Sequence, residues 1–341
     1  MTFLKINNLD IEYQTRKETI SASKNVSFTL KRGEIIGIVG ESGSGKSTIA
    51  NAIINLIDKP GKITNGSILL DETELCNNEE VTRSIRGKKI GFIFQDPQTS
   101  LNPLFTIKDQ LVETIQTHTD LNYEKALEKS IKLLTEVGIE NPEKRINDYP
   151  HQFSGGMRQR VVIALAISCE PDLLIADEPT TALDVSIQFK ILKLLKKLTI
   201  DRKLGVLIIT HDMGVIAEIT DKVIVMRYGK IVEHGETYKV LSQPVSIECK
   251  SLVMSVPPTN KKIDRFKFLS PDGNQIIDTS LKLTNNIIKN WEIREKSNKK
   301  LLDFINIIKI FDENKILSSQ NDENKIKALD NVSFNIFEGE S

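Results

Sequence analysis

A glycine-rich loop that directly follows an apolar run constrains this chain more than any other sequence feature. The run Ile35-Ile-Gly-Ile-Val39 has the length of a buried strand, and Gly40-Glu-Ser-Gly-Ser-Gly-Lys-Ser47 comes directly after it. A helical pattern then begins at Thr48. Glycines let consecutive backbone N–H groups turn toward one anion, and the helix that follows adds the positive end of its dipole. The spacing G-x-x-x-x-G-K-[ST] therefore predicts a phosphate-binding loop between a strand and a helix.

A nucleotide bound at this loop requires a counter-charge and a metal ligand, and the loop contains both. We expect the Lys46 ammonium group to neutralise the β- and γ-phosphates, and the Ser47 hydroxyl to coordinate Mg²⁺. The predicted nucleotide-binding residues of this segment are Gly40, Gly43, Gly45, Lys46, Ser47 and Thr48.

Further apolar runs of strand length are spaced along the chain. Such continuous runs are typical of strands that are buried on both faces of a largely parallel sheet. Helical periodicity, for example at residues 123–137 and 187–198, lies between them. The sequence therefore predicts an α/β architecture, with a mostly helical insert at about residues 97–155. The additional runs are residues 90–94, 173–176, 206–209 and 223–226.

One of these runs ends in two adjacent carboxylates, Asp177 and Glu178. Behind a phosphate-binding loop such a pair has a defined chemistry. Asp177 is predicted to hold Mg²⁺ through water, and Glu178 to polarise the water that attacks the γ-phosphate. Many strands end in an acidic residue at a loop, so the prediction depends on the phosphate-binding loop as well.

A third element, Ser154-Gly155-Gly156-Met157-Arg158-Gln159, precedes these carboxylates and begins a helical run. A serine and two glycines at the start of a helix form another anion-binding helix terminus. With its flanks, the segment reads Tyr149-Pro-His-Gln-Phe-Ser-Gly-Gly-Met-Arg-Gln-Arg-Val161, which resembles the signature of ABC transporter ATPases, usually LSGGQ. Phe153 and Met157 replace the usual Leu and Gln, a form that is similar to the peptide and nickel importer branch.

This resemblance covers residues 1–255. It implies a P-loop NTPase fold of the ABC ATPase type, with a mostly parallel core sheet, an antiparallel β subdomain and a helical subdomain at about residues 97–155. ATP and Mg²⁺ are the implied cofactors. Two such domains would sandwich two ATP molecules, each between a phosphate-binding loop and the Ser154, Gly155 and Gly156 segment of the opposite domain.

The resemblance also implies roles for single residues elsewhere. Gln95 would contact Mg²⁺ and the attacking water and would couple the site to a membrane partner, and His211 would contact the γ-phosphate. Glu178, His211 and Gln95 are thus the implied catalytic residues. Asp184, in Ala182-Leu183-Asp184, would link the two sites across the dimer. Tyr13 would stack on adenine, or else would be ordinary sheet packing.

Composition excludes several other classes of protein. The 341 residues include 46 Lys and Arg against 46 Asp and Glu, so no net charge attracts nucleic acid or anionic lipid. Three scattered cysteines are too few for a disulfide framework or a zinc site. No apolar run approaches the ~20 residues that span a bilayer, so any role in a membrane process is predicted to be exerted from the cytoplasmic side.

An internal repeat follows a change of composition. At residues 256–299, Asn, Lys and Ile dominate and Pro257-Pro258 breaks the chain, which predicts a linker. Asn331-Val-Ser-Phe-Asn-Ile-Phe-Glu-Gly-Glu340 then matches Asn25-Val-Ser-Phe-Thr-Leu-Lys-Arg-Gly-Glu34. We therefore predict that residues 300–341 are the start of a second, truncated ABC ATPase domain that stops just before its own phosphate-binding loop.

Together these features predict an ATP-hydrolysing subunit that powers import of oligopeptides or dipeptides, or of a related small solute such as nickel. The expected partners are membrane permease subunits, a second ABC ATPase domain in the same or another chain and, indirectly, an extracytoplasmic solute-binding protein, with no nucleic acid. The expected location is peripheral, at the cytoplasmic face of the inner membrane. A soluble ABC ATPase that acts on ribosomes or DNA, and a truncated non-functional remnant, are the alternatives.

Overall fold

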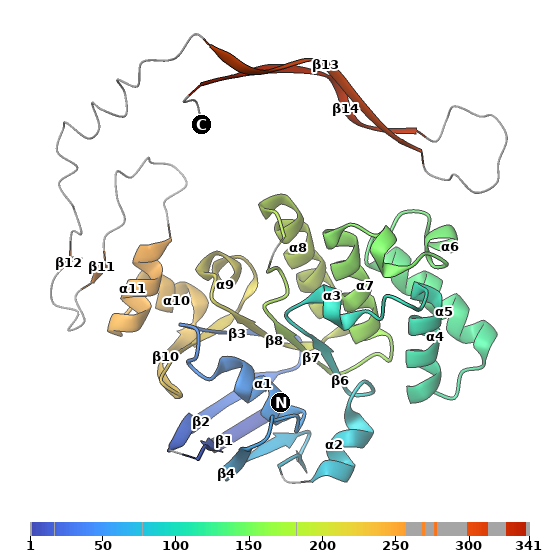
Figure 1. Ribbon diagram of the computed structural model, residues 1–341. Coiled ribbons are helices and arrows are strands. Elements are labelled where there is room, and N and C mark those ends of the chain that lie inside the picture. Colours follow the sequence, from blue (N-terminus) through green and yellow to red (C-terminus); the bar gives the residue numbers. More distant parts are fainter. Residues whose placement is uncertain are drawn as a thin grey trace. The chain divides into compact units, whose positions relative to one another are not determined.

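The computed structural model describes residues 2–16, 18–76, 78–181, 183–256, 268–269, 276–277, 299–312 and 325–338 (Figure 1). The chain divides into two compact units, Met1–Asp278 and Thr279–Ser341. The two units are described one after the other.

The first unit is built around a six-stranded sheet, and all five apolar runs of the sequence are strands in it. The strands are β3 (Ile35–Gly40), β6 (Ile90–Ile93), β7 (Leu173–Asp177), β8 (Gly205–Thr210), β9 (Lys222–Arg227) and β10 (Lys230–Glu236). Their order is β10-β9-β3-β8-β7-β6, and every neighbouring pair is parallel except β10 with β9. Every residue of β3, β7 and β8 is buried, as expected for strands covered on both faces.

Helices follow the strands along the chain and pack on this sheet. They are α1 (Lys46–Ile53), α7 (Gly155–Ile167), α8 (Val185–Arg202), α9 (Met213–Ile219), α10 (Thr237–Ser242) and α11 (Ile247–Ser255). Asp184 and Asp212 cap the N-termini of α8 and α9, because their side chains accept hydrogen bonds from backbone N–H groups of the first turn. Since α1, α8 and α9 each follow a parallel strand, their N-termini lie at the carboxyl edge of the sheet, where ligands bind in such folds.

The first unit also contains a four-stranded antiparallel sheet (Figure 1). Its strands are β1 (Thr2–Gln14), β2 (Thr19–Lys31), β4 (Gly61–Leu70) and β5 (Thr73–Glu74), in the order β2-β1-β4-β5, and α2 (Glu79–Ile85) follows them. One apolar cluster joins β1 to α1 and to the core sheet through Leu4, Ile49 and Ile38, all fully buried. The antiparallel β subdomain that the sequence resemblance implied is therefore present.

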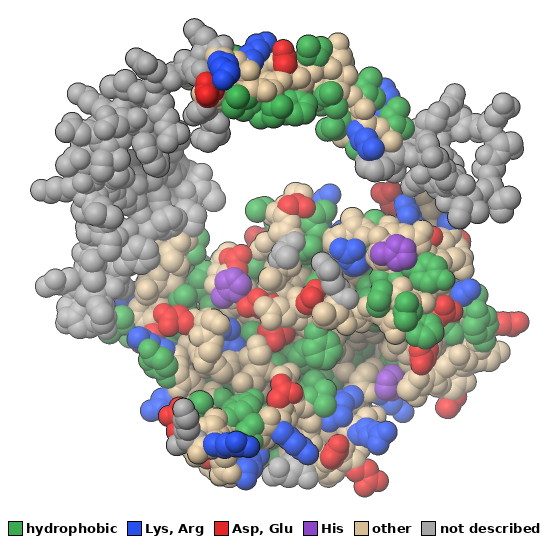
Figure 2. Space-filling view, in the orientation of Figure 1, with side chains coloured by type: hydrophobic (Ala, Val, Ile, Leu, Met, Phe, Trp, Pro, Cys, Tyr) green, Lys and Arg blue, Asp and Glu red, His purple; other side chains and the backbone are tan. Residues whose placement is uncertain are grey.

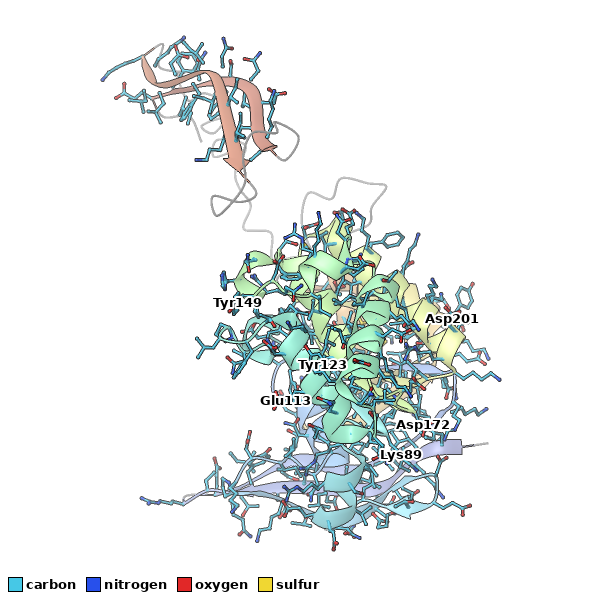
Figure 3. All side chains as sticks on the ribbon, turned by 90° about the vertical axis from the view of Figure 1, so that its right-hand side faces the viewer. Lys89, Glu113, Tyr123, Tyr149, Asp172 and Asp201 are labelled. Carbon is cyan, nitrogen blue, oxygen red and sulfur yellow. The ribbon has the colours of Figure 1, made fainter. Side chains whose placement is uncertain are left out.

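A helical segment is inserted between β6 and β7. It contains α3 (Pro97–Ser100), α4 (Ile107–His118), α5 (Tyr123–Glu136), α6 (Pro142–Arg145) and a short 3₁₀ helix (Pro150–Gln152). Helices α4 and α5 lie against each other (Figure 3), where Glu113 on α4 and Tyr123 at the first position of α5 are labelled. A capping box between Thr106 and Asp109 begins α4. These helices lie within the interval that the sequence predicted to be mostly helical.

Most of the predicted linker at residues 256–299 lies outside the described residues. Within it, β11 (Phe268–Leu269) and β12 (Ile276–Ile277) pair antiparallel. Among the helices that the structure describes, none combines the length and the apolar character that crossing a membrane requires.

The second unit contains an antiparallel hairpin of β13 (Lys300–Asp312) and β14 (Lys325–Phe337). Its strand register repeats that of β1 and β2. Leu302 is paired with Ile336, and the residues at the corresponding positions of the first unit, Leu4 and Leu30, are also paired. The sequence repeat is thus also a repeat of strand pairing.

The first strand of each hairpin also has a register shift at the corresponding position, after Ile6 in β1 and after Phe304 in β13. Asn306 and Asn8 both adopt left-handed backbone conformations, with φ of 52° and 44°. The backbone N–H of Asn306 donates to the Ser333 hydroxyl at 2.8 Å, and that of Asn8 donates to the Ser27 hydroxyl at 2.8 Å. Matching bulges with matching side-chain bonds are specific local features, so the two hairpins share more than a common strand pattern.

The two hairpins differ in burial. Leu4 is fully buried under α1 and the core sheet, whereas Leu302 is 53% exposed. Figure 2 shows apolar side chains exposed along the β13–β14 hairpin. The residues that form a core in the first unit are therefore repeated in the second unit as an apolar surface.

Candidate functional site

The predicted phosphate-binding loop connects β3 to α1 at the carboxyl edge of the core sheet (Figure 1). Gly43 and Gly45 have φ values of 79° and 96°, in the left-handed region that disfavours a side chain. A Cβ atom on Gly45 would also overlap with the carbonyl oxygen of Ala22, whereas one on Gly43 would meet nothing within 4 Å. The loop is therefore tightly packed beside Ala22 and open beside Gly43, where a phosphate group has room.

Two other parts of the chain hold the loop in place. The backbone N–H of Gly229, in the turn between β9 and β10, donates to the carbonyl oxygen of Ser44 at 3.1 Å. The backbone N–H of Lys24 on β2 donates in turn to the carbonyl oxygen of Gly229 at 2.7 Å. A Cβ atom on Gly40, at the start of the loop, would overlap with the carbonyl oxygen of Met226 on β9. Backbone contacts from both sheets thus fix the shape of the loop before a ligand binds.

The Lys46 side chain is buried and lies across the loop. Its Nζ atom donates hydrogen bonds to the carbonyl oxygens of Gly40 and Glu41, both at 2.8 Å. Burial lowers the pKa of this ammonium group, and the nearby carboxylates of Glu178 and Asp177 act in the opposite direction. A lysine held at the loop by carbonyl groups is in position to become the counter-ion of a bound polyphosphate.

Asp177, the last residue of β7, is buried beside Ser47. Burial raises the pKa of Asp177, and the nearby Ser47 hydroxyl acts in the opposite direction. The Oδ1 atom of Asp177 has no hydrogen-bond partner within the described part of the chain. An unpaired buried carboxylate oxygen is costly unless a donor or a cation completes it. The two oxygen ligands fit Mg²⁺, which proteins usually bind through one or two carboxylates together with phosphate oxygens.

Glu178, the next residue, points its carboxylate into a set of three hydrogen-bond donors. His211 Nδ1 lies 2.8 Å from Oε1, while Gln95 Nε2 and Thr181 Oγ1 donate to Oε2 at 2.8 and 2.9 Å. Burial raises the pKa of Glu178, but the hydrogen bonds from His211 and Thr181 outweigh it, so the net shift is downward. The backbone of Glu178 is left-handed, with φ of 48°, and its N–H donates to the Ile209 carbonyl at 2.8 Å. An ionised carboxylate in a fixed direction can act as a general base.

The structure therefore brings together all of the residues that the sequence predicted to be catalytic or metal-binding. Three segments separated in sequence meet at Glu178: the loop after β6 with Gln95, the end of β7, and the loop after β8 with His211. Gln95 donates to Glu178, a contact that the sequence reading did not include. The residues of this group are Lys46, Ser47, Gln95, Asp177, Glu178 and His211.

The Ser154 segment forms a second group with the turn before α8. The Ser154 hydroxyl accepts a hydrogen bond from the backbone N–H of Met157 and caps α7. A Cβ atom on Gly156 would lie 2.6 Å from Ile187 of α8, and one on Gly155 would lie 3.7 Å from Leu183. Asp184 caps α8 by accepting from the Ile187 N–H at 3.0 Å. Two predicted ligand-binding segments are thus packed against each other.

Tyr13 lies on β1, and its ring is partly buried against the antiparallel sheet. A Cβ atom on Gly61 would lie 2.6 Å from Cε1 of the ring, so the absence of a side chain at Gly61 makes room for it. The structure describes a packed aromatic ring at this position, which leaves both predicted roles, adenine stacking and sheet packing, available to it.

Sequence reasoning missed Thr181 and Gly229. The signal for Thr181 was available, because a hydroxyl three residues after a carboxylate is a common turn arrangement. Gly229 had no such signal, since its role depends on a contact between the β9–β10 turn and the phosphate-binding loop.

Comparisons with known proteins agree with this geometry. The family model described as ABC transporter matches residues 23–181. The Dipeptide transport ATP-binding protein DppD of Bacillus subtilis is 46% identical over 256 residues, which are 74% of this chain and 76% of that protein. The Glutathione import ATP-binding protein GsiA of Escherichia coli K12 is 44% identical over 261 residues, which are 74% of this chain and 42% of GsiA.

Solved structures agree as well. The dimeric structure of a post-hydrolysis state of the ATP-binding cassette MJ0796, bound to ADP and Pi, superposes with a TM-score of 0.62 at 33% identity. The superposition covers 69% of this chain and 98% of that cassette. The fold, the phosphate-binding loop and the relatives lead to one conclusion: the chain belongs to the ABC transporter family, as an ATP-binding and ATP-hydrolysing cassette.

Proposed function

We propose that this chain powers the import of oligopeptides or dipeptides, or of a related small solute, through a membrane permease. The observation that carries the proposal is the 46% identity, over 256 residues, to a dipeptide transport ATP-binding protein. The geometry of the site supports it, because the residues that we assign to ATP hydrolysis lie close together.

Within the proposed mechanism, Lys46 exchanges its two carbonyl partners for phosphate oxygens of ATP and neutralises their charge. Ser47 and Asp177 would hold Mg²⁺, which supplies further neutralisation of the β- and γ-phosphates when it is bound. Glu178 accepts the proton of the attacking water as it approaches the γ-phosphate in line. His211 and Gln95, which contact Glu178, are within reach of the same water and the γ-phosphate.

A second cassette would complete each site. The N-terminus of α7, with Ser154, Gly155 and Gly156, offers backbone N–H groups to an anion. We propose that this segment closes on the ATP of an opposing cassette, with Asp184 linking the two sites. The relative MJ0796, whose solved form is described as dimeric, supports such an arrangement.

An apolar groove beside the site supports the proposal that the partner is a permease. The groove, of about 270 Å³, is lined almost entirely by apolar side chains of the first unit, among them Ile90 of β6 and Val162 of α7. Phe92 and Phe94, which lie just before Gln95, contribute rings with centroids 4.3 Å apart, and Phe94 is 47% exposed. A segment of the permease that fills this groove would be coupled through Gln95 to Glu178. The protein would then work at the cytoplasmic face of the membrane.

We also propose that residues 300–338 form the first hairpin of a second cassette, joined to the first by a linker at residues 256–299. The repeated register and the repeated Asn–Ser bond support this assignment. The region that matches this chain makes up only 42% of GsiA, so that relative is longer than the single matched cassette.

Transport and hydrolysis can be tested together. Cells that lack this gene product are supplied with the wild-type chain or with Lys46→Ala, and uptake of a radiolabelled dipeptide and ATP turnover by the purified proteins are measured. We expect uptake and hydrolysis from the wild type and neither from Lys46→Ala. ATP hydrolysis without uptake of any di- or oligopeptide would leave the family assignment intact and overturn the proposed peptide substrate.

A further inference from the structure

Three side chains contact the Glu178 carboxylate: two come from other loops and one comes from the same turn as Glu178. Gln95 and His211 belong to loops after β6 and β8, and the His211 side chain is 64% exposed. Thr181 belongs to the same turn as Glu178, and its own backbone N–H donates to the Glu178 carbonyl oxygen at 3.1 Å. The Thr181 hydroxyl therefore stays with Glu178 whatever the two other loops do.

The difference between Thr181 and the two loop residues affects how Glu178 is held once ATP and water occupy the site. Gln95 and His211 each have a role toward the nucleotide or the water in the proposed mechanism, so neither can serve Glu178 alone. Glu178 also has a left-handed backbone, which for a non-glycine residue needs support from its surroundings. The 2.9 Å bond from Thr181 Oγ1 to Oε2 supplies that support from within the turn.

We propose that Thr181 is a positioning residue for ATP hydrolysis, whose hydroxyl orients the Glu178 carboxylate toward the water that attacks the γ-phosphate. The inference rests on the proposed role of Glu178 as the general base. Thr181 acts only through Glu178, because its single side-chain donor is directed to that carboxylate.

The bond acts on the orientation of the carboxylate. Without the Thr181 hydroxyl, the Glu178 carboxylate loses one of the contacts that fix its direction and gains rotational freedom, which lowers the rate of hydrolysis.

Two variants separate the hydroxyl from the shape of the side chain. Thr181→Val keeps the branched shape and removes the donor, whereas Thr181→Ser keeps the donor. Steady-state ATP hydrolysis is measured for both variants and for the wild type under the same conditions, with kcat and KM for MgATP determined separately. Thermal unfolding is recorded for each variant, so that a folding defect is recognised.

We expect Thr181→Val to lower kcat about tenfold with KM changed less than twofold, since one charge-assisted hydrogen bond is lost. Thr181→Ser restores the rate. A Thr181→Val protein with the wild-type kcat would overturn the inference. So would a Thr181→Ser protein as slow as Thr181→Val, because the donor would then be irrelevant.

The role of Glu178 is checked separately in the same assay. If Glu178→Gln hydrolyses ATP at the wild-type rate, the assignment of the base is wrong, whatever the Thr181 variants do. If Glu178→Gln is inactive and Thr181→Val is fully active, only the positioning role of Thr181 fails.

Discussion

His211 Nδ1 lies 2.8 Å from Oε1 of Glu178, a contact that joins the loop after β8 to the end of the neighbouring strand β7. The two residues are 33 positions apart, and the sequence motifs that suggested them are independent. Two separate sequence patterns therefore lead to one site, in which a carboxylate and an imidazole lie in contact beside the phosphate-binding loop.

The first prediction concerns the base itself. Glu178→Gln keeps the size of the side chain and one acceptor oxygen, but cannot accept a proton from water. We expect kcat for ATP hydrolysis to fall by about 10³-fold while ATP binding is retained. The variant is therefore expected to accumulate as an ATP-bound dimer, measured by size-exclusion chromatography with and without ATP.

The control for this prediction is Lys46→Ala, which is expected to lose ATP binding and therefore to remain undimerised under both conditions. Rapid turnover by Glu178→Gln would remove Glu178 from its assigned role. Dimerisation of the Lys46→Ala variant on addition of ATP would show that the loop is not the principal binding element.

A second prediction concerns the position of Tyr13. The ring occupies space that a side chain at Gly61 would take, with Cε1 only 2.6 Å from where a Cβ atom would lie. Gly61→Ala is therefore expected to displace the ring and to raise KM for ATP several-fold if Tyr13 stacks on adenine. ATP and GTP hydrolysis are compared for Gly61→Ala, Tyr13→Ala and Tyr13→Phe.

The matched control is Tyr13→Phe, which keeps the aromatic face and should hydrolyse ATP with a nearly normal KM. An unchanged KM in both Gly61→Ala and Tyr13→Ala would assign Tyr13 to sheet packing. In that case the loss would be found in thermal stability instead, at about 1–3 kcal/mol for the truncated ring.

The sequence was sufficient for the architecture because burial on both faces leaves continuous apolar runs, such as Ile35–Gly40 in β3. It was also sufficient to locate residues that belong to a local motif, such as Lys46 at the start of α1 and Glu178 directly after β7. It was not sufficient for Gly229, because the bond from its N–H to the Ser44 carbonyl depends on how the β9–β10 turn meets the loop. No periodicity or motif encodes a backbone contact between distant segments.

The contacts of Glu178 illustrate the same limit within the site. Gln95 and His211 were expected to face the nucleotide, and the structure adds that both also contact Glu178. Motifs name the residues of a site, but the partners of each side chain follow from tertiary packing. Thr181 is the exception, because it lies in the same turn as Glu178 and its contact is local.

A third prediction uses the ion pair between Arg227 of β9 and Glu248 of α11. Burial raises the pKa of Glu248, but the hydrogen bond from Arg227 outweighs it and the pKa lies below its ordinary value. The pair therefore contributes stability above the ordinary glutamate pKa of about 4.3, and this contribution is lost as pH falls through the lower folded value. Glu248→Gln removes the titrating group.

Urea unfolding of the wild type and Glu248→Gln at neutral pH and near pH 3 measures this contribution. We expect the variant to be less stable by about 0.5–1 kcal/mol at neutral pH, a range typical of partly exposed pairs, with the difference closing in acid. A difference that is constant with pH would mean that packing of the α11 side chain, and not its charge, stabilises the contact.

The last prediction concerns the apolar surface of the β13–β14 hairpin. Leu302 and Phe334 are 53% and 48% exposed, while Leu4, which corresponds to Leu302 in the first unit, is fully buried. Exposed apolar strands promote association between chains, because unpaired strand edges and apolar side chains find partners. We therefore expect the full chain to self-associate as its concentration rises, as measured by sedimentation velocity.

A double variant, Leu302→Ser with Phe334→Ser, is expected to reduce this association while leaving kcat and KM for ATP within about twofold of the wild type. The kinetic constants should be insensitive because the hairpin belongs to the second unit and the site to the first. The matched control is Lys309→Ser, which changes an exposed polar residue of the same strand and should leave association unchanged. Equal association of the double variant and the wild type would show that this surface does not drive contacts between chains, and a loss of ATPase activity would show that the hairpin supports the first cassette directly.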